Sequence, residues 1–248
     1  MMAHRTRTFA AAIFDVDGVL LDSPHEQAWR DALPGFADPA RFTTALYQAH
    51  VAGKPRLKGA LAALRALGVP DAEEHAEAYA ERKQHLLQAP TDHVAAAPYP
   101  DGLRLLEALA ALRWPLAAAS SSKNANTMMQ EVSLPSGQPL PEAFTANVCG
   151  REVSRGKPDP TLFLLAAFEL GVPPPQCLVI EDAPSGIAAA VAAGMGAIGV
   201  ARHADRLELQ AAGAHLVVAN LDDVAVDELG AGRLRRRVAR PELSAWTT

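Results

Sequence analysis

Two aspartates stand close together near the beginning of the chain. Asp15 and Asp17 follow the apolar run 9–14 and precede Gly18. Alternate side chains of a strand point to the same side, so both carboxylates face one way, and the glycine lets the chain turn sharply. Their mutual repulsion in a low-dielectric site calls for a cation or a shared proton. Taken alone, the pair also fits a strand end with an Asx turn, whereas Val19 and the strand context exclude an EF-hand.

Three further polar groups follow later apolar runs or precede a helical stretch. Residues 120–124 are Ser-Ser-Ser-Lys-Asn, Lys157 stands before Pro158, and Glu181 and Asp182 are adjacent. Pro158 suits the first turn of a helix. Open α/β sheets place their ligands at the carboxyl ends of parallel strands, where we expect all four groups. Together they supply acids for Mg²⁺, a hydroxyl and backbone N–H groups for phosphoryl oxygens, and a lysine for negative charge, which phosphoryl transfer requires.

Two of these residues also have ordinary structural interpretations. Lys157 fits a surface lysine. Ser120 fits a helix cap, and capping would not prevent its hydroxyl from contacting a phosphate.

The elements that must position these groups follow from hydrophobic patterning. Continuous apolar runs of four to six residues suit strands that are buried on both faces. The runs are 9–14, 115–119, 177–180, 197–200 and 215–219. Helical stretches between them are 103–112, 161–170 and 187–193. This alternation predicts an α/β fold with a doubly wound parallel sheet.

One long segment interrupts the alternation of strands and helices. Residues 23–97 contain helical patterns at 26–33, 57–67 and 72–87, and we find no strand pattern among them. A turn-rich seam follows at 98–102. We therefore predict a domain formed by residues 1–22 and 98–248, and an all-helical domain of residues 23–97 inserted after the first strand.

Composition limits the other classes of protein. The 248 residues are 49% apolar and 21% charged, and 23 Lys and Arg against 28 Asp and Glu give a net charge of −5. No basic face for nucleic acid is evident, and the basic stretch 233–240 fits the solvated end of a helix. Cys149 and Cys177 form neither a disulfide framework nor a zinc pattern. No signal peptide or membrane segment is evident, so we expect a cytoplasmic monomer that binds neither nucleic acid nor membrane.

The four motifs, in this order, resemble those of the haloacid-dehalogenase-like (HAD) superfamily, in particular its members with a helical cap after the first motif. The resemblance spans about residues 11–220 and implies a Rossmann-like core. It implies that Asp15 is the nucleophile and becomes an aspartyl phosphate. Asp17 then protonates the leaving oxygen and later deprotonates the acceptor. Ser120 supplies the hydroxyl of the second motif, and Lys157 is the lysine of the third.

The same resemblance implies Mg²⁺ as the cofactor. Its predicted ligands are Asp15, Asp17, Glu181 and Asp182. A carboxylate is a competent nucleophile towards phosphorus when Mg²⁺ and a lysine neutralise its approach.

The inserted helices resemble the cap of β-phosphoglucomutases. The similar segments are 25–29, 53–56, 82–83 and 120–124, whereas residues 22–25 are two residues shorter than the mutase pattern. The predicted substrate-binding residues are His25, Arg56, Lys83, Ser122, Lys123 and Asn124. By this resemblance Arg56 binds a distal phosphate, and His25 and Lys83 help to close the cap. Their ordinary interpretations are a helix residue for His25 and solvated surface positions for Lys83 and Arg56.

The predicted function is Mg²⁺-dependent phosphoryl transfer on a small sugar phosphate, such as a hexose phosphate, by a β-phosphoglucomutase-like phosphohexomutase. The alternative is a sugar-phosphate phosphatase that uses water as acceptor. A metal-free dehalogenase and a non-catalytic phospholigand-binding module are more remote alternatives. Residues 194–199 fit the dinucleotide pattern GxGxxG, but a helix precedes them and a strand follows, which is the wrong order for NAD binding.

Overall fold

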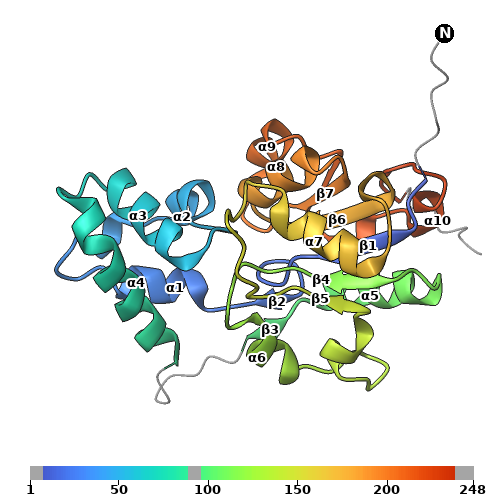
Figure 1. The fold of residues 1–248 in the computed structure, drawn as a ribbon, viewed down its shortest axis with the longest axis horizontal. Coiled ribbons are helices and arrows are strands. Elements are labelled where there is room, and N and C mark those ends of the chain that lie inside the picture. The colour runs from blue at the N-terminus through green and yellow to red at the C-terminus, as the bar shows by residue number, and fades with distance from the viewer. Residues whose placement is uncertain (1–7, 89–95, 238–248) are drawn as a thin grey trace, which may run out of the picture.

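The computed structural model describes residues 8–88 and 96–237 and contains a six-stranded parallel sheet at its centre (Figure 1). In spatial order the strands are β5 (Ala146–Asn147), β4 (Leu116–Ala118), β1 (Ala11–Phe14), β6 (Cys177–Glu181), β7 (Gly196–Val200) and β8 (Leu216–Val218). All five predicted runs form strands, which confirms the predicted α/β fold. The sequence pattern missed β5, which is only two residues long.

The first strand lies at the point where the strand order reverses. β1 pairs with β4 on one side and with β6 on the other, and Ile13 lies opposite both Ala117 and Val179. The chain fills one side of β1 with β4 and β5 and then crosses to the other side for β6, β7 and β8. Such a switch point opens a crevice at the carboxyl ends of the strands. Asp15, Ala119 and Asp182 directly follow the three central strands at this edge.

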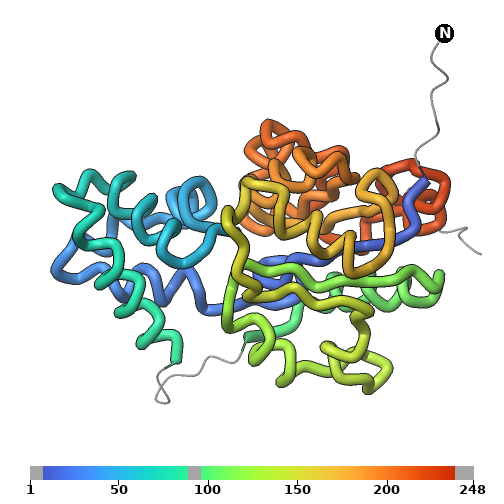
Figure 2. The backbone as a smooth tube through the Cα atoms, in the orientation of Figure 1, coloured from blue at the N-terminus to red at the C-terminus, as the bar shows by residue number. Residues whose placement is uncertain are grey.

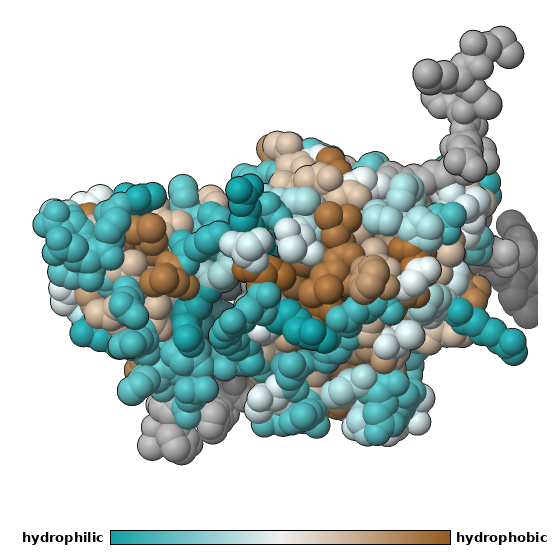
Figure 3. Space-filling view, viewed as in Figure 1, coloured by the Kyte–Doolittle hydropathy of each residue, from teal (hydrophilic) through white to brown (hydrophobic). Residues whose placement is uncertain are grey.

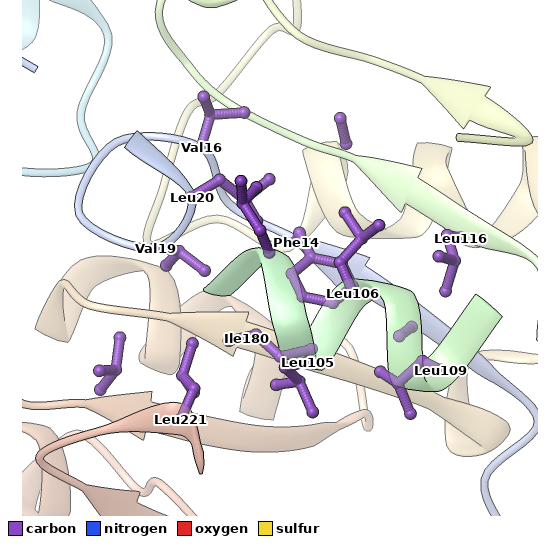
Figure 4. Packing of buried hydrophobic residues seen from close by; sticks show 14 of the residues in the cluster. Phe14, Val16, Val19, Leu20, Leu105, Leu106, Leu109, Leu116, Ile180 and Leu221 are labelled. Carbon is purple, nitrogen blue, oxygen red and sulfur yellow. The ribbon is translucent and has the colours of Figure 1, made fainter. Parts of the chain in front are cut away.

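Helices cover both faces of the sheet. The core helices are α5 (Pro100–Ala111), α6 (Ala125–Gln130), α7 (Thr161–Leu170), α8 (Pro184–Ala192), α9 (Arg206–Ala211) and α10 (Val226–Leu229). Short 3₁₀ turns lie at Leu140–Ala143, Pro174–Gln176 and Leu221–Asp223. In β1, Phe14 packs with leucines of α5, as Figure 4 shows, whereas Ile13 packs with Phe163 of α7. Burial on both faces explains why the strands are uninterrupted apolar runs.

A separate group of helices occupies the predicted insert. They are α1 (His25–Asp31), α2 (Thr44–His50), α3 (Arg56–Ala66) and α4 (Ala72–Gln88), with a 3₁₀ turn at Pro39–Arg41. Figure 2 shows them as a lobe beside the sheet. The lobe has its own apolar core, in which the Tyr79 hydroxyl donates to the Trp29 carbonyl (2.8 Å) and the two rings lie 5.0 Å apart. The helical patterns in the sequence predicted α1, α3 and α4 but not α2.

Two short strands connect the lobe to the sheet. β2 (Leu21–Asp22) pairs antiparallel with β3 (Ala97–Pro98), so the segments before and after the insert lie side by side. The seam predicted at 98–102 is wrong in part, because α5 already begins at Pro100. Proline suits this first helical position, since its missing N–H has no partner there in any helix.

Three other local expectations have clear outcomes. Pro158 lies outside α7, which begins at Thr161, where the Asp159 carboxylate accepts the Thr161 N–H (3.0 Å). The stretch at 233–237 does not end a helix, because Arg236 forms an isolated bridge with Val224; residue 240 lies outside the described residues. Residues 194–199 do follow helix α8 and open strand β7, as expected.

The outer face of α7 is unusually apolar for a surface helix. Leu164 and Phe168 stand one turn apart and are 38% and 83% exposed, and Figure 3 shows brown surface over this helix.

Among the described residues, no helix is both long and apolar enough to cross a membrane.

An ion pair secures the loop that follows β1. The Arg202 guanidinium donates to both carboxylate oxygens of Asp101 (2.8 and 3.0 Å) and to the carbonyls of Gly18 (3.0 Å) and Val19 (3.4 Å). Asp101 also accepts the backbone N–H of Leu221 (2.8 Å). The Arg202–Asp101 ion pair therefore connects the loop after β1, which carries Asp15 and Asp17, to α5 and to the segment after β8.

We expect Asp101→Asn to lower the free energy of unfolding by about 3 kcal/mol at pH 7, because it leaves the Arg202 side chain, which is only 10% exposed, without its charged partner. Burial alone would raise the pKa of Asp101, but the hydrogen bonds from Arg202 and Leu221 outweigh it and hold the pKa below its usual range. The stabilisation is therefore complete above the unfolded value of about 3.9 and is lost as the pH falls through the lower folded value.

Urea unfolding of wild type and variant between pH 7 and pH 3 measures this difference. The control is Asp222→Asn, because Asp222 pairs with Arg104 at a half-exposed site and should contribute less than about 1 kcal/mol. Two outcomes would contradict the role of the Arg202–Asp101 pair. One is an equal loss of unfolding free energy in the two variants. The other is a difference in unfolding free energy between wild type and Asp101→Asn that does not become smaller as the pH falls.

Candidate active site

A cavity of about 520 Å³ lies between the helical lobe and the carboxyl edge of the sheet. The loops after β1, β4 and β6 form one wall, and α1, α2, α4 and the segment before α3 form the opposite wall. Its lining includes most of the predicted site residues: Asp15, Asp17, His25, Arg56, Lys83, Ser120, Ser122, Lys123, Asn124 and Asp182. Lys157 and Glu181 lie directly behind this wall.

Lys157 is held between two carboxylates from neighbouring strands. Its Nζ lies 2.5 Å from Asp15 Oδ1 and 2.5 Å from Glu181 Oε1, and the ammonium lies 4.8 Å above the Phe163 ring. The lysine is 1% exposed, so its interpretation as a surface residue is wrong. Asp15 directly follows β1 and Glu181 is the last residue of β6, so the pairing of these two strands sets the spacing that the lysine bridges.

The electrostatics of this buried cluster favour mutual neutralisation. Burial is the largest influence on the Asp15 carboxyl and raises its pKa, whereas Lys157 opposes this rise and Glu181 and Asp17 add to it. Burial alone would lower the pKa of Lys157, but Asp15 and Glu181 together raise it. The lysine therefore carries a permanent positive charge beside the predicted nucleophile.

Glu181 differs from its expected role as a metal ligand. Its Oε1 accepts Lys157, and its Oε2 accepts the backbone N–H groups of Asp182 and Ala183, both at 2.9 Å. The side chain is completely buried and does not line the cavity. A Cβ at Gly186 would lie 1.8 Å from Oε1, so α8 packs against the carboxylate. Because both oxygens already have protein partners, we infer that Glu181 positions Lys157, whereas its role as a metal ligand stays a prediction.

Three other carboxylates have the chemistry to hold Mg²⁺. Asp15, Asp17 and Asp182 line the cavity together, and the buried Asp17 Oδ1 has no hydrogen-bond partner in the described part of the chain. Burial raises the pKa of Asp182 well above its usual value, and the neighbouring acids add to the rise. Carboxylate oxygens are the ligands that Mg²⁺ prefers, so this donor set fits the ion. Across residues 8–88 and 96–237, however, no three such side chains are already gathered as a metal site.

Ser120 connects the second motif to the acid pair. Its hydroxyl donates to Asp17 Oδ2 (3.3 Å) and accepts the backbone N–H of Ser122 (3.1 Å). It does not cap α6, which begins at Ala125 with Asn124 at its N-cap position. The hydroxyl therefore lies at the acid pair.

Side chains of the lobe meet this edge of the sheet directly. His25 Nε2 lies 3.0 Å from the Ser122 hydroxyl and 3.6 Å from Asp17 Oδ1, and Lys83 Nζ lies 3.3 Å from His25 Nδ1. Burial lowers the pKa of His25 to about 4 and that of Lys83 to about 8. Lys83 is 4% exposed, so its interpretation as a solvated residue is wrong. The structure brings the predicted residues His25, Lys83 and Ser122 together at the acid pair.

Two predicted cations lie at the edge of the cavity. Arg56 is the first residue of α3 and is exposed. Lys123 is exposed as well and pairs with Glu152 (3.0 Å). The predicted Asn124 exchanges two hydrogen bonds with Gln84 of α4 (2.9 and 3.2 Å) and so connects the lobe to the core.

Sequence reasoning missed several residues of the cavity. Tyr47 and Gln48 line it from α2, a helix that the pattern did not reveal. Ser121 also lines it and donates to the Gly53 carbonyl of the lobe (2.9 Å). The Thr43 hydroxyl, which accepts the Leu46 N–H, is the N-cap signal that could have revealed α2.

Fold and cavity together define the class of α/β enzymes that transfer phosphoryl groups. The model of the haloacid dehalogenase-like hydrolases matches residues 9–194, and the chain belongs to this family. It is 31% identical over 218 residues to hexitol phosphatase A of Escherichia coli (strain K12), covering 86% of this chain and 92% of that protein. It is 32% identical over 241 residues to a β-phosphoglucomutase of Mycobacterium bovis, covering 86% and 90%.

Solved structures agree with this assignment. The archaeal β-phosphoglucomutase of Pyrococcus sp. strain ST 04 superposes with a TM-score of 0.69 at 28% identity, covering 90% of this chain and 99% of that one. The resemblance to the phosphoglucomutase-like subgroup is thus confirmed, and the chain is an enzyme of the HAD phosphotransferase type.

Glu181 and Asp182 have different surroundings, so we expect substitutions of the two residues to have different effects. We expect Asp182→Asn to raise the Mg²⁺ concentration for half-maximal activity about tenfold or more, because it removes a carboxylate from the cavity. We expect Glu181→Gln to lower kcat about a hundredfold with little change in that concentration, because it releases Lys157. Magnesium titrations of aryl phosphate turnover measure both. Circular dichroism controls for folding, and the opposite assignment of the two effects would contradict the geometry.

Proposed function

We propose that the enzyme transfers a phosphoryl group from a small sugar phosphate, such as a hexose phosphate, through an aspartyl phosphate on Asp15. The observation that carries this proposal is the buried lysine at the predicted nucleophile. Lys157 engages Oδ1 of Asp15 and leaves Oδ2 for the attack on phosphorus. Because the lysine is buried and doubly paired, its charge needs no reorganisation when negative charge develops at the phosphoryl group.

The proposed chemistry has two halves. In the first, a carboxylate oxygen of Asp15 forms a bond to phosphorus, the bond to the ester oxygen breaks, and Asp17 gives that oxygen its proton. In the second, an acceptor hydroxyl attacks the aspartyl phosphate, Asp17 takes its proton, and the Asp15 carboxylate is released. The Ser120 hydroxyl donates to the Asp17 carboxylate (3.3 Å) and so orients it at the site.

Bound Mg²⁺ would lower the repulsion between the carboxylates and the phosphoryl oxygens. Asp15, Asp17 and Asp182 are its proposed ligands. Binding would need rearrangement of these side chains, since they are not gathered as a ready metal site in the described residues.

The proposed acceptor is a second hydroxyl of the sugar, as in a β-phosphoglucomutase. Support comes from three cations that line the cavity, Lys54, Arg56 and Lys123, which could hold the second phosphate of a bisphosphorylated intermediate. Water is the second candidate acceptor. Its support is the similarity to hexitol phosphatase A, which extends over most of both chains.

We also propose a division of the chain into domains, an oligomeric state and a cellular location. We assign residues 23–97 as a cap domain over a core formed by residues 1–22 and 98–248. The two groups of helices have separate apolar cores, which supports this division. We further propose a cytoplasmic monomer that acts on a small phosphorylated metabolite. Residues of this one chain line the cavity, and its two cysteines are free and buried.

A product assay distinguishes the two acceptors. The enzyme is incubated with Mg²⁺ and a panel of sugar phosphates that includes β-glucose 1-phosphate, with and without a trace of the 1,6-bisphosphate. Glucose 6-phosphate and inorganic phosphate are measured in parallel. We expect glucose 6-phosphate to form and chelation to abolish turnover. Release of phosphate alone would identify a phosphatase, and turnover that survives complete chelation would contradict the proposal as a whole.

Because Arg56 lies at the edge of the cavity, we expect its substitution to affect the turnover of one substrate more than that of another. We expect Arg56→Ala to lower kcat/KM for a hexose bisphosphate about tenfold more than for a minimal aryl phosphate, because only the bisphosphate carries a distal phosphate. Steady-state kinetics on both substrates measure the ratio. Arg65→Ala is a matched control on the same helix, where Arg65 pairs with Glu73 on the surface. Equal losses on the two substrates would exclude a role in distal binding.

A further inference from the structure

One polar side chain of the cavity wall lacks a partner. Gln48 lies on α2 of the lobe and is 6% exposed. Its Oε1 is buried and has no hydrogen-bond partner among the described residues, although the residue lines the cavity. A buried amide oxygen without a partner keeps the full cost of losing its water. Such an atom at the wall of a ligand cavity is explained if a ligand supplies the missing bond.

The neighbouring polar side chains already have partners within the protein. Glu26 accepts hydrogen bonds from Thr44 (2.9 Å) and from Arg30. Gln84 of α4, in the same wall, and Asn124 at the sheet edge bond to each other. Unlike these groups, the amide oxygen of Gln48 has no hydrogen-bond partner in the described part of the chain.

Helix α2 places the Gln48 amide in the same cavity as the predicted catalytic acids. Tyr47 precedes Gln48 and lines the same cavity; burial raises the pKa of its hydroxyl well above the ordinary value, with added effects of Asp17 and Asp182. The tyrosine therefore stays neutral and lies within electrostatic reach of the acids. The segment after α2 contacts α8, because a Cβ at Gly53 would lie 2.6 Å from the Ser185 hydroxyl. Gln48 thus presents a neutral hydrogen-bonding group from the lobe, whereas the opposite wall carries the carboxylates.

We propose that Gln48 binds a hydroxyl group of the substrate and thereby makes the cavity selective for polyhydroxylated phosphate monoesters. A hydroxyl both donates and accepts, so it can pair with either end of the amide. A phosphate monoester without hydroxyls would leave the amide buried and unpaired, and a site of this kind discriminates against such an analogue. This inference rests on the proposed function, because it assigns the substrate class of the same cavity.

The test compares two phosphates of equal chain length. Glucitol 6-phosphate carries five hydroxyls, one on each of carbons 1 to 5, whereas n-hexyl phosphate carries none. Dissociation constants are measured by calorimetry with Mg²⁺ present, in the Asp15→Asn background, which prevents turnover. We expect the parent to bind glucitol 6-phosphate at least tenfold more tightly than n-hexyl phosphate. Equal affinities in this parent would overturn the inference without any further variant.

The variant Gln48→Met keeps the length of the side chain and removes its polar atoms. We expect it to reduce the preference for glucitol 6-phosphate at least tenfold, and Gln48→Asn to give an intermediate preference. Gln210→Met, at an exposed position of α9, is the matched control and should keep the parental preference. Thermal unfolding reports whether each variant is folded.

The outcomes separate the inference from the function on which it rests. An unchanged preference in Gln48→Met, or equal weakening of both ligands, would overturn the hydroxyl-binding role even if the enzyme with Asp15 intact turns over sugar phosphates. Loss of the preference together with failure of that enzyme to turn over any phosphate monoester would support the binding role and contradict the proposed function. Binding of neither phosphate would overturn both.

Discussion

A lysine buried between two carboxylates is the interaction on which the rest of the structure depends. Removing Lys157 from water is costly, and only close pairing with Asp15 and Glu181, at 2.5 Å each, offsets that cost. The carboxylates belong to the ends of neighbouring parallel strands, so the register of the sheet sets their spacing. Two backbone N–H groups hold the second oxygen of Glu181. The fold thereby keeps one positive charge beside the carboxylate that is proposed to attack phosphorus.

The helical lobe contributes the other half of the site without sharing the core of the sheet. Its apolar residues pack among themselves, whereas polar bonds such as His25 to Ser122 and Gln84 to Asn124 join it to the sheet edge. The cavity therefore lies between two parts that pack separately and are joined by polar contacts.

The sequence predicted the sheet and the main motifs because both have local signals. Fully buried strands are uninterrupted apolar runs, and Asp15, Asp17 and Lys157 lie in short motifs beside them. It did not predict how Glu181 points, since the choice between cavity and interior depends on Lys157 and on the turn into α8. It also missed α2 and with it Gln48, because a seven-residue helix has little periodicity and its site role depends on tertiary packing.

Trapping the phosphorylated enzyme tests the role of Asp15 as nucleophile most directly. Wild-type protein is mixed with Mg²⁺ and a radiolabelled sugar phosphate and quenched in acid within milliseconds. Borohydride then reduces an acyl phosphate to homoserine, which mass spectrometry locates in the sequence. The account predicts acid-stable, base-labile label on the protein and homoserine at Asp15 alone. Turnover without any label on the protein, or label at another residue, would contradict it.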